Sequence, residues 1–134
     1  MSDYGDITIK NHKKYNKKIV FVIFNECFID DEVKLTTIVK EYHKIIEENP
    51  GIYSVVDGRA VKGCSKTLAF SKAKNLKKYE ELVKRNLVCM SILLDNPVLK
   101  MLMDAVTRIH PFVVPTRVVN NNKDAMDYIL ENIK

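Results

Sequence analysis

Residues 52–65 read IYSVVDGRAVKGCS. Ile52 to Val56 is rich in β-branched and aromatic residues, which predicts a short central strand. Asp57 to Ser65 is a glycine-bearing segment, and a long basic helix is expected to follow from Ser65. Such a loop, between a strand and a helix N-terminus, is where α/β domains often bind anions or present a hydroxyl that can be modified. This segment therefore bears on both fold and function.

The spacing of Gly58 and Gly63 is similar to that of a nucleotide-binding P-loop, which needs a Lys and then a Ser or Thr after the second glycine. Ser65 stands where the hydroxyl is needed, but Cys64 occupies the lysine position. Without the lysine, the terminal phosphates of a nucleotide lose their main positive charge. The motif therefore does not predict an NTPase. Anion binding at the helix N-terminus and a plain tight turn both remain open.

The hydrophobic pattern predicts further elements on both sides of this segment. Strands are expected over residues 4–10, 18–25, 52–56, 87–94 and 116–119. Helices are expected over residues 30–49 and 65–85, between a start at 95–97 and a stop at 110–111, and after the caps at 120–122. The order β-β-α-β-α-β-α-β-α predicts one α/β domain over residues 1–134, with an initial hairpin and a mostly parallel sheet. In the helix over 65–85, Lys72 is the exception on an otherwise apolar face.

Bulk composition indicates an ordinary globular domain. The chain has 134 residues, of which 46% are hydrophobic and 29% are charged. Neither a secretory signal nor a membrane-spanning run is visible, and Cys27, Cys64 and Cys89 do not suggest a disulfide framework. We therefore expect a cytoplasmic protein. His12 and the other two histidines are scattered, so no metal site or cofactor is expected.

The segment after the central strand supplies the candidate site residues. Those expected to bind a partner or an anion are Asp57, Arg59, Lys62, Cys64, Ser65 and Lys66. Cys64 is a candidate reactive thiol, because a helix N-terminus and nearby lysines favour the thiolate. Ser65 is either a plain helix N-cap or a phosphorylation site, where the helix dipole would stabilise a phosphate.

Basic residues farther along the chain suggest other partners. Lys74, Lys77 and Lys78 form a candidate basic surface on the helix over 65–85, and the net charge is +5. This surface permits nucleic-acid binding but does not favour it, because few aromatic residues accompany the lysines. The edge strand over residues 4–10 is a candidate for pairing with a second copy, which would give a homodimer.

Several local strings resemble the STAS superfamily, and the SpoIIAA-like branch in particular. They are YSVVDGR at 53–59, YEELVKR at 79–85, PTRVV at 115–119 and DAMDYIL at 124–130. The resemblance implies a small α/β fold with a mixed sheet and helices mainly on one face. It also implies a non-enzymatic role in protein–protein recognition, with Ser65 matching the serine that is phosphorylated in switchable members.

Three functions follow from these observations. The leading interpretation is a non-catalytic STAS-like module that binds a protein partner. The second is a carrier of a small apolar ligand or lipid, because the SpoIIAA-like fold is similar to that of CRAL-TRIO lipid carriers. It predicts an apolar cavity between sheet and helices. The third is a nucleic-acid-associated basic protein, whose binding would weaken steeply with salt.

Overall fold

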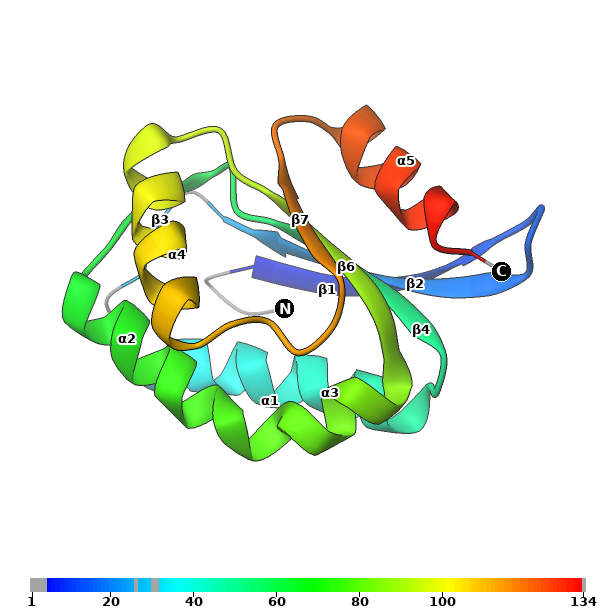
Figure 1. Cartoon of the computed structure of the whole chain (residues 1–134), viewed down its shortest axis with the longest axis horizontal. Coiled ribbons are helices and arrows are strands. Elements are labelled where there is room, and N and C mark those ends of the chain that lie inside the picture. The colour runs from blue at the N-terminus through cyan, green and yellow to red at the C-terminus, as the bar shows by residue number, and fades with distance from the viewer. Residues whose placement is uncertain (1–4, 26, 30–31, 134) are drawn as a thin grey trace.

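The computed structural model of the protein describes residues 5–25, 27–29 and 32–133, with the side chains of 27–34 and 64 excepted. Five strands form one mixed sheet in the order β1-β2-β4-β6-β7 (Figure 1). Their bounds are β1 Gly5–His12, β2 Lys17–Phe24, β4 Ile52–Asp57, β6 Leu87–Leu93 and β7 Thr116–Val119. β1 and β2 are antiparallel, and every other pairing in this sheet is parallel.

Helices cover both faces of the sheet, but unequally. Their bounds are α1 Glu32–Glu48, α2 Lys66–Asn75, α3 Glu80–Asn86, α4 Pro97–Ile109 and α5 Asn122–Glu131. Figure 1 shows α1, α2, α3 and α4 on one side of the sheet and α5 on the other. The α/β class, the mixed sheet and helices mainly on one face are therefore confirmed.

Alternation along the strands explains these two layers. Successive strand side chains point to opposite faces. In β2, Ile19 packs in the cluster that contains Ile129 of α5, whereas Val20 packs in the cluster that contains Ile38 of α1. The buried strands β4 and β6 likewise contribute to both clusters, as near-continuous apolar runs in parallel sheets do.

The structure differs from the predicted element order in two places. A short second sheet pairs β3 (Cys27–Ile29) with β5 (Val61–Cys64), so part of the predicted loop is a strand. The predicted helix over 65–85 is divided into α2 and α3 by a 3-10 turn, η1 (Leu76–Tyr79). The predicted start of the first strand at residue 4, and the predicted start of the next helix at residues 30 and 31, lie outside the described residues.

Among the described residues, no helix combines the length and the apolar character needed to cross a bilayer. In the same part of the chain, no cluster of His, Cys, Asp and Glu side chains is arranged to hold a metal ion.

Candidate functional site

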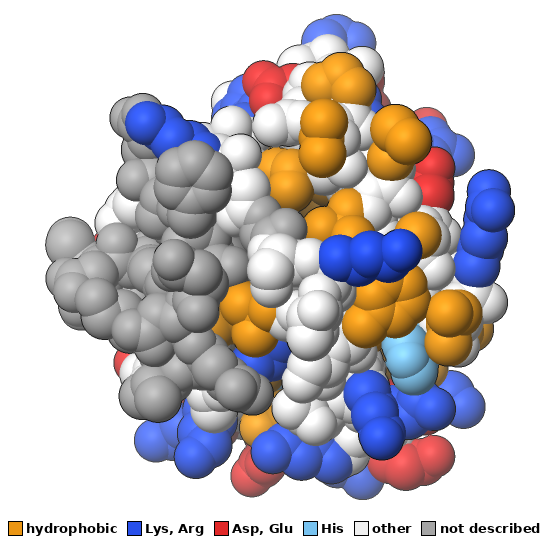
Figure 2. All heavy atoms as spheres, turned by 90° about the vertical axis from the view of Figure 1, so that its left-hand side faces the viewer, with side chains coloured by type: hydrophobic (Ala, Val, Ile, Leu, Met, Phe, Trp, Pro, Cys, Tyr) orange, Lys and Arg blue, Asp and Glu red, His pale blue; other side chains and the backbone are white. Residues whose placement is uncertain are grey.

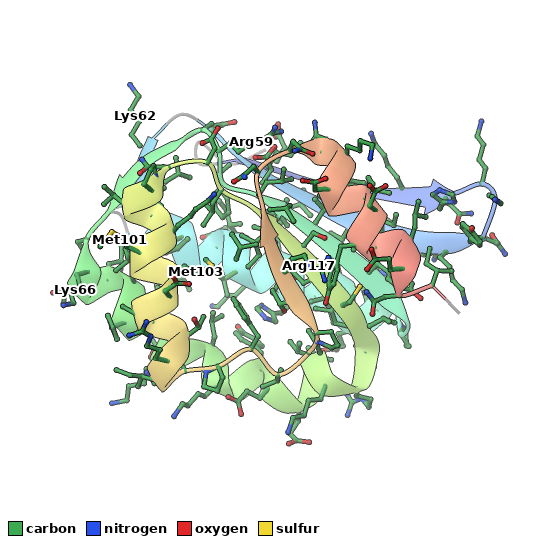
Figure 3. All side chains as sticks on the ribbon, turned by 45° about the horizontal axis from the view of Figure 1, so that its top comes forward. Arg59, Lys62, Lys66, Met101, Met103 and Arg117 are labelled. Carbon is green, nitrogen blue, oxygen red and sulfur yellow. The ribbon has the colours of Figure 1, made fainter. Side chains whose placement is uncertain are left out.

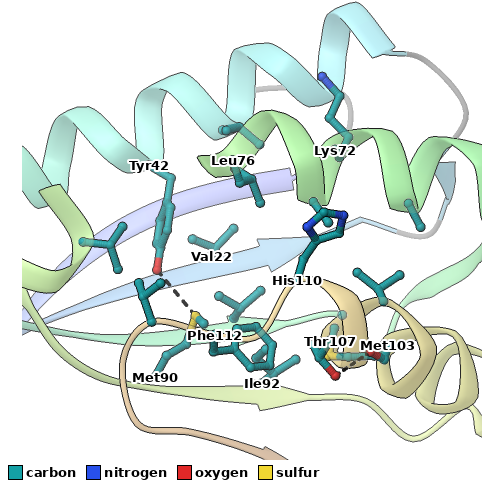
Figure 4. Close-up of a pocket in the computed structure, with 18 of the residues that line it drawn as sticks. Val22, Tyr42, Lys72, Leu76, Met90, Ile92, Met103, Thr107, His110 and Phe112 are labelled. Atoms are coloured by element: carbon teal, nitrogen blue, oxygen red, sulfur yellow. Dashed lines mark hydrogen bonds between the residues drawn. The ribbon is translucent and has the colours of Figure 1, made fainter. Parts of the chain in front are cut away.

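A cavity of about 450 Å³ lies between the sheet and helices α1, α2 and α4 (Figure 4). Its volume falls within the range of small-molecule sites, roughly 300–1,000 Å³. Val22, Met90 and Ile92 line it from the strands, and Leu76 and Met103 line it from the helical side. Most of the remaining lining is also apolar.

The cavity exists because the helices above it do not reach the sheet. Ile38 and Ile46 of α1, like Ala125 and Ile129 of α5, are fully buried in the core. By contrast, α2 and η1 have no buried residue, and α4 buries only Leu99 at its N-terminal end. Helices α2 and α4 pack against each other instead. The space beneath them is therefore left open.

A tyrosine brings one hydroxyl to the cavity wall from α1. The Tyr42 hydroxyl lies 2.7 Å from the Ser54 hydroxyl. It also donates to the Met90 sulfur at 3.7 Å (Figure 4). Burial raises the pKa of Tyr42 to about 12, and the hydrogen bond with Ser54 only partly opposes this rise. Tyr42 is therefore neutral at physiological pH, and this part of the wall carries no charge.

A second polar group enters at the C-terminal end of α4. The His110 ring lines the cavity, and its Nδ1 atom is buried without a hydrogen-bond partner in the described structure (Figure 4). An unsatisfied buried polar group typically costs about 1–3 kcal/mol. The neighbouring Thr107 hydroxyl does not satisfy it, because that hydroxyl donates to the Met103 carbonyl at 2.9 Å. Because this atom has almost no accessible surface, it faces neighbouring protein atoms rather than the open space of the cavity.

Lys72 of α2 brings positive charge to the same cavity. Its side chain is half-buried in the lining, and its ammonium donates to the Thr36 hydroxyl of α1 at 2.5 Å. Lys77 also lines the cavity, and Glu80 is the acidic residue among the described lining residues. The described part of the wall therefore carries charged groups of both signs.

A shallower groove of about 330 Å³ lies on the outer surface between α1 and the η1–α3 segment. His43 and Tyr79 stack there with ring centroids 3.8 Å apart. Burial is the largest influence on the pKa of His43 and lowers it, so the ring is held neutral despite its bond to the Val39 carbonyl. Lys40 and Lys78 are among the cations that border this groove.

Two of the predicted site residues, Asp57 and Arg59, form an internal pair. The Arg59 side chain donates to both carboxylate oxygens of Asp57, at 3.0 and 2.8 Å, and the Arg59 backbone N–H donates as well. Arg59 also donates to Asn122 at the start of α5 at 3.1 Å. Partial burial raises the pKa of Asp57, but the contacts from Arg59 outweigh it and the net pKa is lowered. The pair thus ties β4 to α5.

The glycines of the predicted segment serve packing and strand pairing. The Gly58 N–H donates to the Leu93 carbonyl at 2.9 Å, and a Cβ at this position would lie 2.9 Å from Leu94. Gly63 pairs with Phe28 in the second sheet, so the P-loop spacing does not form a phosphate-binding loop.

Ser65 is the N-cap of α2, because its hydroxyl accepts the Leu68 N–H at 3.0 Å. Lys62 and Lys66 are exposed, and Figure 3 shows both pointing outward at the edge formed by β5 and the start of α2, away from Arg59. The five predicted residues whose side chains are described, Asp57, Arg59, Lys62, Ser65 and Lys66, therefore do not converge on one point. The side chain of Cys64 lies outside the described part of the structure.

The predicted basic surface lies elsewhere. Lys74 is exposed near the end of α2, and Lys77 and Lys78 are exposed on η1. The Lys78 ammonium lies 5.2 Å from the centre of the Tyr79 ring, next to the outer groove. Nucleic-acid binding at this surface stays a prediction.

Sequence reasoning included the cavity as an alternative but did not assign its polar residues. One signal was present, since Lys72 interrupts the apolar face of the predicted helix. The structure explains this exception, because that face lines a cavity. His110 carried no such signal, because its neighbours across the cavity come from distant parts of the chain.

Comparison with known proteins is limited to fold. No protein-family model matches the chain, and no curated protein matches it. A solved structure of an uncharacterized protein of the DUF3478 family from Shewanella loihica PV-4, described as having a SpoIIAA-like fold, matches with a TM-score of 0.55. The match covers 92% of both chains at 14% sequence identity. The chain therefore has the SpoIIAA-like fold that the local strings at 53–59 and 124–130 implied.

Proposed function

We propose that the protein is a non-catalytic STAS-like module that binds a small apolar ligand in the cavity between its sheet and helices. The observation that carries this proposal is the apolar cavity of about 450 Å³ beneath α2 and α4. An empty apolar cavity forgoes the dispersion contacts of close packing, so a bound apolar molecule would restore them.

The polar groups of the cavity support binding rather than turnover. Tyr42 is neutral and pairs with Ser54, and the Thr107 hydroxyl donates to a backbone carbonyl instead of to His110. A nucleophile is normally activated by a base within hydrogen-bond reach. Neither hydroxyl of the lining has that arrangement in the described structure.

Fluorescence titration with the uncharged probe N-phenylnaphthylamine tests this proposal. We expect saturable binding at one site, weakened by Val106→Phe, because Val106 lines the cavity. Val98→Phe is the matched control on the same helix, since Val98 is 72% exposed on the outer face. Absence of saturable binding, or equal weakening by both substitutions, would contradict the proposal. If the probe binds as expected, native mass spectrometry of gently purified protein can identify a co-purified natural ligand.

A second candidate, recognition of a protein partner, is favoured by the outer face of α4. Val98 and Met101 are each 72% exposed and Ile109 is 63% exposed. Figure 3 shows Met101 pointing outward and Met103 inward, and Figure 2 shows hydrophobic side chains with Lys and Arg among them on this side. A contiguous exposed apolar face commonly marks an interaction surface. The Lys and Arg side chains on this side favour an acidic protein segment as the occupant.

A phosphate on Ser65 would regulate such binding. It would add negative charge at the start of α2, next to Lys66, and so oppose an acidic partner.

The test of this second candidate compares the proteins retained by the wild type with those retained by Met101→Glu. A retained protein is then purified, and its affinity for the wild type and for Met101→Glu is measured at two salt concentrations. Equal affinity for both forms, or self-association of the chain that Met101→Glu abolishes in sedimentation experiments, would contradict this second candidate.

A further inference from the structure

The outer edge of β1 is the longer of the two edges of the five-stranded sheet. Within the described part of the chain, β1 and β7 stand at the ends of the strand order, and they have 8 and 4 residues. The register of β1 on β2 runs without a shift from Gly5 to His12, and Thr8 to Asn11 are exposed. A regular edge strand presents backbone N–H and C=O groups with which another strand can pair.

The side chains of β1 alternate between the two faces of the sheet. Ile7, which packs against the core cluster of α1, and Ile9, which is 44% exposed, lie on one face. Asp6 and Lys10 lie on the opposite face, where the Lys10 ammonium is 5.4 Å from the centre of the Phe21 ring. Neither Asp6 nor Lys10 forms an ion pair with a described residue.

Two-fold symmetry restricts how β1 can pair with β1 of a second copy. The two strands are antiparallel, and facing residues lie on the same side of the joined sheet, so one residue must lie opposite itself. With Thr8 opposite Thr8, Asp6 of each copy faces Lys10 of the other. In the same register, Ile7 of each copy faces Ile9 of the other. Centring the pair one residue earlier or later separates both sets of partners.

This register therefore places opposite charges together on one face and apolar side chains together on the other. Directly opposed pairs of either kind stabilise a sheet, and a shift of register loses them. Charged residues on an edge strand usually oppose pairing with another chain. Here the charges of Asp6 and Lys10 attract each other across the two-fold axis.

We propose that the chain forms a homodimer in which β1 pairs antiparallel with β1 of a second copy, with Thr8 opposite Thr8. The inference goes beyond the proposed function, because no residue of β1 lines the cavity. One strand from each copy makes a small interface, so we expect a reversible dimer with a dissociation constant in the micromolar range.

Sedimentation equilibrium over a range of protein concentrations tests the charge pairing. We expect a wild-type dimer that Asp6→Lys and Lys10→Glu each weaken about tenfold, because each substitution places like charges opposite each other at two positions. The variant that carries both substitutions should regain the wild-type affinity. A wild type that stays monomeric at every concentration would overturn the inference, as would a double variant that dimerises no better than the single ones.

Lys84→Glu is the matched control for Lys10→Glu, because it makes the same change in net charge. Lys84 is exposed on α3, which packs against α1 and β6, and two strands separate β6 from β1. This substitution should leave the dimer unchanged. Equal weakening by Lys84→Glu and Lys10→Glu would show that net charge controls association, which would also overturn the inference.

Single cysteine substitutions test the register while the charges stay in place. In oxidised glutathione, Thr8→Cys should form an intermolecular disulfide fastest, because directly opposed residues bring their Cβ atoms within about 4.5–5.5 Å. Ile7→Cys and Ile9→Cys should crosslink more slowly, since each faces itself only in a shifted register. Non-reducing electrophoresis measures the three rates, and mass spectrometry identifies the linked peptides. Faster crosslinking at position 7 or 9 than at position 8 would overturn the proposed pairing.

Discussion

Asp57 and Arg59 show how single residues join distant elements. Asp57 ends β4, and Arg59 bridges its carboxylate to Asn122 at the start of α5. The Asp57 side chain is only 15% exposed, and that of Arg59 is 31% exposed. The ion pair is therefore shielded more than a typical surface pair, and it holds the two layers in register.

The lowered pKa of Asp57 makes this contact dependent on pH. Because the folded-state pKa lies below the unfolded one, the pair stabilises the fold above the unfolded pKa of about 3.9. That stability is lost as the pH falls through the folded-state pKa. We expect Asp57→Asn to lower the free energy of unfolding by about 1 kcal/mol near pH 7, since solvent screens part of the interaction. The difference from wild type should shrink below about pH 4 in urea titrations.

Asp127→Asn is the control for this experiment. Asp127 pairs with Lys123 on the surface of α5, with side chains 51% and 84% exposed. Exposed pairs contribute little, so we expect no resolvable change in the free energy of unfolding. A pH-independent difference for Asp57→Asn would contradict the ionic role of the pair.

Residue roles could be predicted where they depend on neighbours in sequence. A plain N-cap was one of the two roles expected of Ser65, and a helix start was expected at 95–97; Ser65 and Asn96 both accept backbone N–H groups there. The pairing of Asp57 with Arg59 was not predicted, and neither was the contact with Asn122. Such contacts depend on how the elements pack, which local patterns do not encode.

At the scale of elements, α4 is the helix that most affects the cavity. It begins at Pro97 after the Asn96 cap, whose side chain accepts the Val98 N–H at 2.9 Å and the Leu99 N–H at 3.4 Å. Only Leu99 is buried, so α4 is held mainly at its N-terminal end and by α2. The cap therefore positions one wall of the cavity.

Loss of this cap should affect stability and binding together. We expect Asn96→Ala to lower the free energy of unfolding by about 1 kcal/mol and to weaken N-phenylnaphthylamine binding, while Asn96→Asp preserves both. Asn75→Ala is the control, because Asn75 precedes η1 and makes no side-chain capping bond. Urea denaturation and probe titration measure the two effects. Unchanged probe binding in a destabilised Asn96→Ala protein would show that α4 does not shape the cavity.

The elements that sequence could not predict arise from tertiary contacts. The apolar spacing continues across Leu76 to Tyr79, yet the helix tightens there, where Tyr79 stacks on His43 of α1. The short strands β3 and β5 pair across more than one intervening element, and neither has a strong local pattern. The longer elements, by contrast, have clear hydrophobic periodicity and were predicted.

At the scale of the molecule, the two faces of the sheet differ in packing. On one face α5 forms a closed core with Ile19, Val55 and Cys89. On the other, α1 is well packed, but α2 and α4 leave the cavity. Element order predicted the sheet and its class, whereas the cavity depends on how far two helices lie from the strands. That distance follows from side-chain packing and could not be derived from the pattern.

Filling the cavity should stabilise the ligand-free molecule. Ala73 lines the cavity from α2, so Ala73→Leu adds apolar carbons where no other side chain is packed. We expect the free energy of unfolding of the ligand-free protein to rise by about 1 kcal/mol, because the added carbons are buried. Ala60 is exposed, so Ala60→Leu is the control, and it should change the free energy of unfolding by less than about 0.5 kcal/mol.

The same variant separates a binding cavity from a packing gap that closes in solution. If the cavity persists, the ligand-free Ala73→Leu protein is more stable than the ligand-free wild type. Added ligand then stabilises Ala73→Leu less than it stabilises the wild type, since a ligand stabilises only a form that binds it. If the helices close onto the sheet in solution, the added side chain overpacks the core, and stability falls by about 1–3 kcal/mol. Urea denaturation with and without N-phenylnaphthylamine distinguishes these outcomes, because the sign of the change in ligand-free protein is opposite in the two cases.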